Sequence, residues 1–176
     1  MKRLVLISVL TAAFFVMNGC SSMNVMVKYD DEVQFEKYKT FRFVKPKHKG
    51  KKSVRDPFFT KEVMQEIRPM MEARGFQEAE SMEQADLLVH FYAYVRNGAN
   101  YMPPTYHRGR WGRVRAVTPG RVVHYKTGTL VIDMVDRDKK EVVWQGVGKG
   151  VLDRFDPSTD LVKAVEEVLK DFPPVQ

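Results

Sequence analysis

The sequence predicts an α+β fold: a single domain with a mainly antiparallel sheet of about five strands and two helices packed on one face. Three observations lead to this prediction. Several short segments alternate apolar and polar residues as strands do, two longer segments repeat apolar residues at helical spacing, and predicted hairpins follow one another with the helices set between them. Read in chain order, the elements are β-β-α-β-β-β-α.

The first residues have the pattern of a secretory signal peptide. Lys2 and Arg3 give a positive start, and residues 4–16 are mainly apolar. This apolar stretch is shorter than the roughly 20 residues that a membrane-spanning helix needs. We expect residues 1–19 to be removed.

Cys20 is the only cysteine of the chain, so an intramolecular disulfide is excluded. The run Met17-Asn18-Gly19-Cys20 resembles the box that lipidation enzymes recognise before attaching diacylglycerol to the cysteine. The alternative is a free or buried cysteine that happens to follow an apolar run. We expect Cys20 to be lipidated, residues 20–24 to form a tether, and residues 25–176 to form the domain.

Two strands are expected next, at 25–29 and 38–44, and we expect them to pair as a hairpin. Residues 45–55 have the composition of a solvated loop. A helix is predicted from Asp56, which can cap it, with a possible end at Gly75 and with Pro69 producing a kink or an early end. Its apolar face comprises Phe59, Val63, Ile67, Met70 and Met71.

The nearly continuous aliphatic and aromatic residues at 86–95 predict a central strand. The stretch at 97–120 has no apolar period and is predicted to be a long loop rich in basic and aromatic residues. The strongest hairpin joins 122–135 to 141–151 through a polar turn. Trp144 is expected to be buried in this hairpin. The chain ends with a helix that Asp156-Pro157-Ser158 opens and Pro173-Pro174 stops, with an apolar face formed by Leu161, Val165, Val168, Leu169 and Phe172.

Several short motifs together resemble those of a bacterial lipoprotein family known as domain of unknown function 4136. The motifs are Tyr29-Asp30, Tyr38-Lys39-Thr40-Phe41, Ala85-Asp86-Leu87-Leu88-Val89, Gly128-Thr129-Leu130-Val131-Ile132-Asp133 with Asp136, Val143-Trp144 with Gly146, and Phe172-Pro173-Pro174. The resemblance covers essentially the whole mature chain and implies a lipid-anchored envelope protein with this fold. It supplies no catalytic residues.

Charge is segregated along the chain. The mature chain has 27 basic and 22 acidic side chains, a net charge of +5. One acid-free stretch holds Lys45, Lys47, Lys49, Lys51, Lys52 and Arg55, and a second holds Arg96, Arg108, Arg110, Arg113, Arg115, Arg121 and Lys126. No carboxylate occurs between residues 87 and 132, where Tyr101, Tyr106, Trp111 and Tyr125 lie among the arginines.

This second stretch predicts a binding surface for an anionic envelope component. Arginine matches phosphate and carboxylate groups, and aromatic rings pack on sugars or lie at lipid headgroups. The candidate residues are Arg108, Arg110, Trp111, Arg113 and Arg115. Lipopolysaccharide, phospholipid headgroups and peptidoglycan are candidate ligands, whereas export argues against nucleic acid. The alternative is a solvated basic loop without a ligand.

No metal site, cofactor or catalytic constellation is predicted. Asp133, Asp136 and Asp138 have the short spacing of calcium ligands but suit a tight turn better. His90, His107 and His124 lack the spacing of a zinc site. The glycines at 146, 148 and 150 lack the pattern of a phosphate loop and are better explained by close packing of another element on the strand.

These observations favour a non-enzymatic, lipid-anchored envelope protein that binds an anionic envelope component or a partner protein. Two alternatives stay open: an envelope enzyme acting on cell-wall or lipid substrate, and a structural subunit of an envelope complex. Ser21 follows the cysteine in place of the aspartate that marks inner-membrane retention, so we expect the periplasmic face of the outer membrane.

Overall fold

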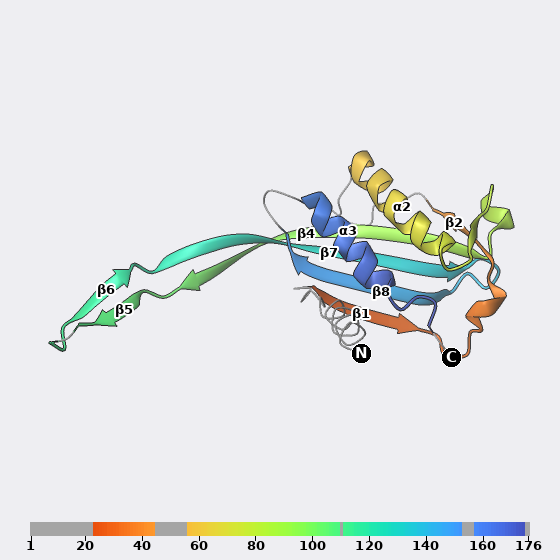
Figure 1. Ribbon diagram of the computed structural model, residues 1–176. Helices are drawn as coiled ribbons and strands as arrows, with labels where there is room; N and C mark the ends of the chain where they lie inside the picture. Colours follow the sequence, from red (N-terminus) through yellow and green to blue (C-terminus); the bar gives the residue numbers. More distant parts are fainter. Residues whose placement is uncertain (1–22, 45–55, 110, 153–156, 175–176) are drawn as a thin grey trace, which may run out of the picture.

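The computed structural model describes residues 23–44, 56–109, 111–152 and 157–174. The predicted signal peptide, Cys20, the basic loop at 45–55 and the capping Asp156 lie outside these residues. One mixed sheet of six strands, in the order β1-β8-β7-β4-β2-β3, has both helices on one face (Figure 1). The predicted α+β class is confirmed.

The large sheet contains β1 (Asn24–Tyr29), β2 (Thr40–Phe43), β3 (Gln77–Glu78), β4 (Leu87–Met102), β7 (Arg121–Asp136) and β8 (Val142–Val151). The helices are α2 (Pro57–Glu72) and α3 (Pro157–Leu169), with short 3-10 helices η1 (Phe35–Lys37) and η2 (Met82–Gln84). Along the sheet, β1, β8, β7 and β4 each run antiparallel to the next strand. β2 runs parallel to both of its neighbours, β4 and β3. Among the helices of the described residues, none is both long enough and apolar enough to cross a membrane.

The predicted hairpin of the first two strands is wrong. β1 pairs antiparallel with β8, and β2 pairs in parallel with β3 and β4. The connection between them carries Phe35, which is buried and packs edge-on against the rings of Tyr38 and Phe172. These contacts hold the connection across the end of the sheet, so β1 and β2 reach opposite sides of it.

Helix α2 begins as predicted, because Asp56 accepts a hydrogen bond from Phe58 N at 2.9 Å and Pro57 lies in the first turn. Its face of Val63, Ile67 and Met71 is buried. The helix does not end at Pro69 but continues to Glu72. Gly75 follows with a φ of +89°, as a C-terminal glycine stop requires.

The closing hairpin and α3 form the centre of the core. Trp144 is fully buried, as predicted, and its ring lies 5.1 Å from that of Phe172. A Cβ added at Gly148 would lie only 2.7 Å from Val168 Cγ2 on α3. Gly146 and Gly148 therefore let α3 approach the sheet closely, which confirms the predicted packing role for these two glycines.

The segment at 97–120 is not the irregular loop that the sequence predicts. β4 continues to Met102 and pairs residue for residue with β7, and a second ribbon of β5 (Thr105–Arg108) and β6 (Val114–Thr118) extends it. Prolines and glycines interrupt the apolar alternation here, but backbone pairing resumes beyond the interruption. Figure 1 shows this hairpin projecting far from the body of the domain.

Candidate functional site: a basic and aromatic hairpin arm

We call residues 97–126 the arm. On β7, only residues Thr127 to Val135 pair with β8. Next to them, Leu152 N donates to Lys126 O at 2.9 Å. Beyond this point β4 and β7 pair only with each other among the described strands. From residue 97 to the turn at 109 the arm is about 40 Å long at roughly 3.3 Å per residue.

Two tyrosines lie against glycines along the arm. A Cβ added at Gly98 would lie 2.4 Å from the ring of Tyr125, its cross-strand partner. A Cβ added at Gly120 would lie 2.5 Å from the hydroxyl of Tyr101. The rings therefore cover bare backbone at two levels and give the ribbon cross-strand contacts of its own.

The tip of the arm is a tight turn with an exposed ring. Gly109 N donates to Arg113 O at 3.0 Å, and Gly112 has a φ of +71°. Trp111 lies in this turn and is 90% exposed. Tyr101 and Tyr106 are also mostly exposed, at 66% and 62%. Large apolar side chains are thus distributed along the arm without a core to cover them.

The candidate residues of the sequence lie in the outer half of the arm. Arg108 ends β5, Trp111 and Arg113 lie in the turn, and Arg115 lies in β6. Arg110 lies outside the described residues. Three further basic residues are exposed too: Arg96 just before the arm, Lys126 at its base, and Arg121 midway along it, opposite Met102. In the part of the chain that the structure describes, Arg96, Arg108, Arg113, Arg121 and Lys126 form no ion pair.

The histidines do not converge. His90 is in the body of the sheet opposite Asp133, His107 is in β5, and His124 is in the arm portion of β7. Within the described ranges, no three histidine, cysteine, aspartate or glutamate side chains form a group that could hold a metal ion.

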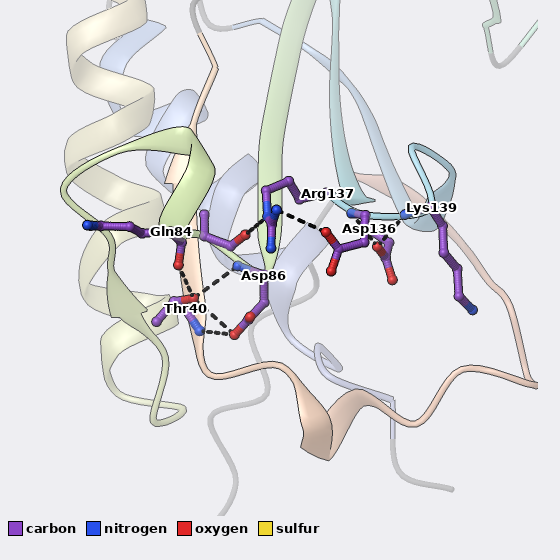
Figure 2. A network of polar contacts seen from close by, with 8 residues as sticks. Thr40, Gln84, Asp86, Asp136, Arg137 and Lys139 are labelled. Atoms are coloured by element: carbon purple, nitrogen blue, oxygen red, sulfur yellow. Dashed lines mark hydrogen bonds and ion pairs between the residues drawn. The ribbon is translucent and has the colours of Figure 1, made fainter.

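The opposite end of the sheet carries a network of hydrogen bonds (Figure 2). Asp86 Oδ2 accepts from Lys39 N and Thr40 N at 2.8 and 2.9 Å. Arg137 Nε donates to Ala85 O at 2.7 Å. Burial alone would raise the pKa of Asp86, but the hydrogen bonds from Lys39 and Thr40 outweigh it and hold the pKa below its usual value.

Asp136 has the same character in the turn between β7 and β8. Its Oδ1 accepts from Asp138 N and Lys139 N at 2.8 and 2.9 Å, and its Oδ2 accepts from Tyr38 Oη at 2.8 Å. Burial opposes ionisation, yet these hydrogen bonds lower the pKa of Asp136. Burial and the bond to Asp136 raise the pKa of the Tyr38 hydroxyl. The predicted turn role of Asp136 is confirmed.

The sequence did not indicate a polar cluster on the sheet face away from the helices. Asp133 is only 6% exposed there, between buried Ile132 and Met134 of the opposite face. Its carboxylate accepts from Tyr92 Oη and, at 2.8 Å, from Gln145 Nε2. The only available signal was that Asp133 falls on the alternate face of a strongly apolar strand.

The described geometry fits the family motifs quoted above. The model for the domain of unknown function DUF4136 matches residues 25–174. The chain belongs to the DUF4136 family. No curated protein matches the sequence.

Solved structures show the same fold. A DUF4136 family protein from Bacteroides thetaiotaomicron is 20% identical, with a TM-score of 0.56 over 87% of this chain and 97% of its own. A PDZ domain protein from Parabacteroides distasonis is 15% identical, with a TM-score of 0.58. The match covers 88% of this DUF4136 chain but only 36% of that protein. PelC from Paraburkholderia phytofirmans, described as a dodecamer, is 13% identical with a TM-score of 0.51 over 88% and 99% of the two chains.

The DUF4136 motifs of this chain correspond to structural positions. Hydrogen bonds from Tyr38 to Asp136 and from Thr40 to Asp86 join the start of β2 to the β7–β8 turn and to the start of β4. The rings of Trp144 and Phe172 pack together in the core. The exposed groups with binding chemistry lie elsewhere, on the arm.

Proposed function

We propose that this DUF4136 protein is a lipid-anchored envelope protein whose arm binds the phosphate groups of anionic envelope lipids. One observation carries the proposal: the arm projects exposed arginines and aromatic rings from the domain, with no carboxylate between residues 87 and 132. Arginine pairs with phosphate through parallel hydrogen bonds, and tryptophan and tyrosine favour the headgroup level of a membrane.

The position of the arm on the domain supports this function. Asn24 pairs with Lys149, which lies opposite Thr129, and Thr129 lies opposite Tyr94 near the base of the arm. The described chain therefore starts at the end of the sheet from which the arm projects (Figure 1). A lipid on Cys20, three residues before Met23, would bring the arm to the same membrane surface.

The structure of the arm also favours a surface ligand. A two-stranded ribbon is only marginally stable alone in water, and its outer backbone groups need water or polar partners. Headgroups at a membrane surface supply both polar partners and an apolar layer for the rings. Lipid headgroups and lipopolysaccharide share the phosphate chemistry that the arginines recognise.

Vesicle co-sedimentation tests the proposal. The mature chain made without its signal peptide, and hence without lipid, should bind vesicles that contain phosphatidylglycerol or lipid A and not vesicles of phosphatidylcholine alone. Replacement of Arg108, Arg110, Arg113 and Arg115 by serine should weaken this binding strongly at low salt without changing the melting temperature. The proposal fails if the wild-type chain does not bind at low salt or if the fourfold variant binds equally well.

A second candidate function is assembly of several copies into an envelope complex. β1 is an edge strand of the described sheet, and Met26 and Tyr29 on it are about half exposed. Exposed edge strands can pair with another chain. Sedimentation of the mature chain over a concentration series tests this candidate, and a monomer at all concentrations would rule it out.

A further inference from the structure

An apolar cavity of about 290 Å³ lies between the starts of the two helices and the sheet. Phe58 and Phe59 of α2 and Leu161 of α3 form its walls, and Ala93 and Gly150 belong to its floor. This volume is at the lower end of the range of small-molecule sites, roughly 300–1,000 Å³.

The cavity exists because β8 has glycines on the face toward α3. Among the described residues, Met23 has the only side chain close to both Gly148 and Gly150: a Cβ added at Gly148 would lie 3.3 Å from its Sδ, and one added at Gly150 would lie 3.4 Å from its Cε. Val168 closes the space over Gly148, whereas no other described residue than Met23 lies within 4 Å of a Cβ added at Gly150. A larger side chain at position 150 would therefore fill the cavity.

The first residue that the structure describes lies at this cavity. Met23 lines it, and Cys20 precedes Met23 by three residues. A chain spans at most about 3.6 Å per residue, so Cys20 lies within about 11 Å of Met23. At the rim, Phe58 is 77% exposed, which is unusual for a large apolar ring next to an apolar hollow.

The charges around the cavity select among apolar ligands. Its described lining includes the carboxylates of Asp56, Glu62 and Asp160 and contains no lysine, arginine or histidine. A free fatty acid or a phospholipid headgroup at this rim would meet charge of its own sign. An acyl chain esterified to glycerol on a cysteine has no charge and suits the site.

We infer that the cavity holds one acyl chain of the lipid attached to Cys20 of the same molecule. This inference rests on the lipidation in the proposed function and adds an intramolecular site for the lipid. It also explains why the arm would be needed for anchoring. If one acyl chain of the diacylglycerol occupies the cavity, only the other chain remains to insert into the membrane. A single chain gives marginal, reversible binding, and a basic surface supplies the second signal that stable anchoring needs.

Photocrosslinking of the full protein in its native membrane tests the inference. Cells are fed a fatty acid with a diazirine near the end of its chain, irradiated, and the protein is digested for mass spectrometry. We expect crosslinks to peptides that contain Phe58 and Phe59 or Leu161 and Ala164. A labelled protein crosslinked only to membrane lipid overturns the inference while lipidation stands, and a protein without label overturns both.

Binding of the neutral fluorophore N-phenyl-1-naphthylamine tests the cavity separately. The mature chain made without lipid should bind the probe saturably, and Gly150→Leu should weaken binding about tenfold or more, equivalent to about 1.4 kcal/mol. Val147→Leu, on the other face of the same strand, is the matched control and should bind as wild type. Phe58→Ala should also weaken binding at unchanged melting temperature, because this ring is mostly exposed.

The fourfold arginine variant of the arm should bind the probe normally, which separates the cavity from vesicle binding. If the lipid-free wild-type chain does not bind the probe, or if folded Gly150→Leu binds it equally well, the cavity does not accept an apolar chain and the inference is wrong.

Discussion

Val168 of α3 occupies the space directly above Gly148 of β8, and any side chain at position 148 would collide with it. Gly150, two residues along the same strand, lies instead beneath the flexible end of Met23. The two glycines look alike in the sequence, but they differ in what covers them.

This difference predicts opposite responses to the same substitution. Gly148→Ala should lower the free energy of unfolding by about 1–3 kcal/mol, because α3 must shift to admit the added methyl group. Gly150→Ala should change stability little, since its added Cβ would make an ordinary contact with Met23. Urea unfolding of both variants measures the difference. Equal losses would show that α3 does not pack on β8 in this way.

Trp144 gives a second test of the core. Trp144→Ala should lower the free energy of unfolding by about 3–5 kcal/mol, because it empties a fully buried site. Its indole Nε1 is buried with no hydrogen-bond acceptor among the described residues. Trp144→Phe removes this unsatisfied donor, whose burial costs about 1–3 kcal/mol, and should therefore cost less than half as much as alanine. A phenylalanine variant as unstable as the alanine variant would contradict the unpaired donor.

The network in Figure 2 predicts loss of stability in acid. Asp86 and Asp136 have pKa values in the folded protein below their ordinary values, which are near 3.9 for the unfolded chain. Their contribution is therefore complete above the unfolded pKa and is lost as the pH falls through the folded pKa.

Asp86→Asn should lower the free energy of unfolding by about 1–2 kcal/mol at pH 7, because the amide is a weaker acceptor for the two backbone N–H groups. The gap from wild type should close as the pH falls below the ordinary aspartate pKa of about 3.9 and through the lower pKa of folded Asp86, where the wild-type carboxylate becomes protonated too. Urea unfolding across this pH range measures the gap, and Asp138→Asn, at a mostly exposed side chain, is the control. If the difference in free energy of unfolding is the same at every pH, the loss of stability comes from altered packing at position 86 and not from the lost negative charge.

The sequence predicted those features that depend on local chemistry. The Asp56 cap, the buried face of α2, the turn at Asp136 and the packing role of the β8 glycines each follow from residue type and short spacing. Pairing between distant segments did not follow in the same way. Nothing near β1 indicates that it joins β8 instead of β2, because that choice depends on contacts made by Phe35 across the end of the sheet.

The charge pattern of the sequence located the candidate site, but the sequence did not predict that the site is a paired hairpin. Pro103-Pro104 and Pro119-Gly120 interrupt the alternation that marks strands, so the segment resembled a loop. The interruptions lie opposite each other across the hairpin, which lets pairing resume in β5 and β6. The apolar cavity had no sequence signal at all, because α2, α3, β8 and Met23 form it together.

Lipidation at Cys20 is a prediction of the sequence that can be tested in cells. Cys20→Ala should leave unprocessed precursor and abolish fatty-acid labelling, because the chain contains no second cysteine to accept the lipid. Ser21→Ala is the matched control and should be processed and labelled normally. Undiminished labelling of Cys20→Ala would end the lipoprotein interpretation.

Charge and ring contributions of the arm can be separated by salt. Exposed charges are screened over about 8 Å at physiological ionic strength and over about 3 Å at 1 M, so the arginine contribution to vesicle binding should fall steeply with salt. Residual binding at high salt should depend on Trp111, which is 90% exposed at the tip and can insert its ring at the headgroup level.

We therefore expect the fourfold arginine variant and the wild-type chain to converge as salt rises, while Trp111→Ala stays weaker than wild type throughout. Co-sedimentation of the lipid-free chain with phosphatidylglycerol vesicles over a salt series measures both curves, and Val114→Ala, an exposed apolar residue beside the turn, is the control for general loss of apolar surface. If Trp111→Ala follows wild type at every salt concentration, the ring does not contact lipid and binding by the arm is electrostatic alone.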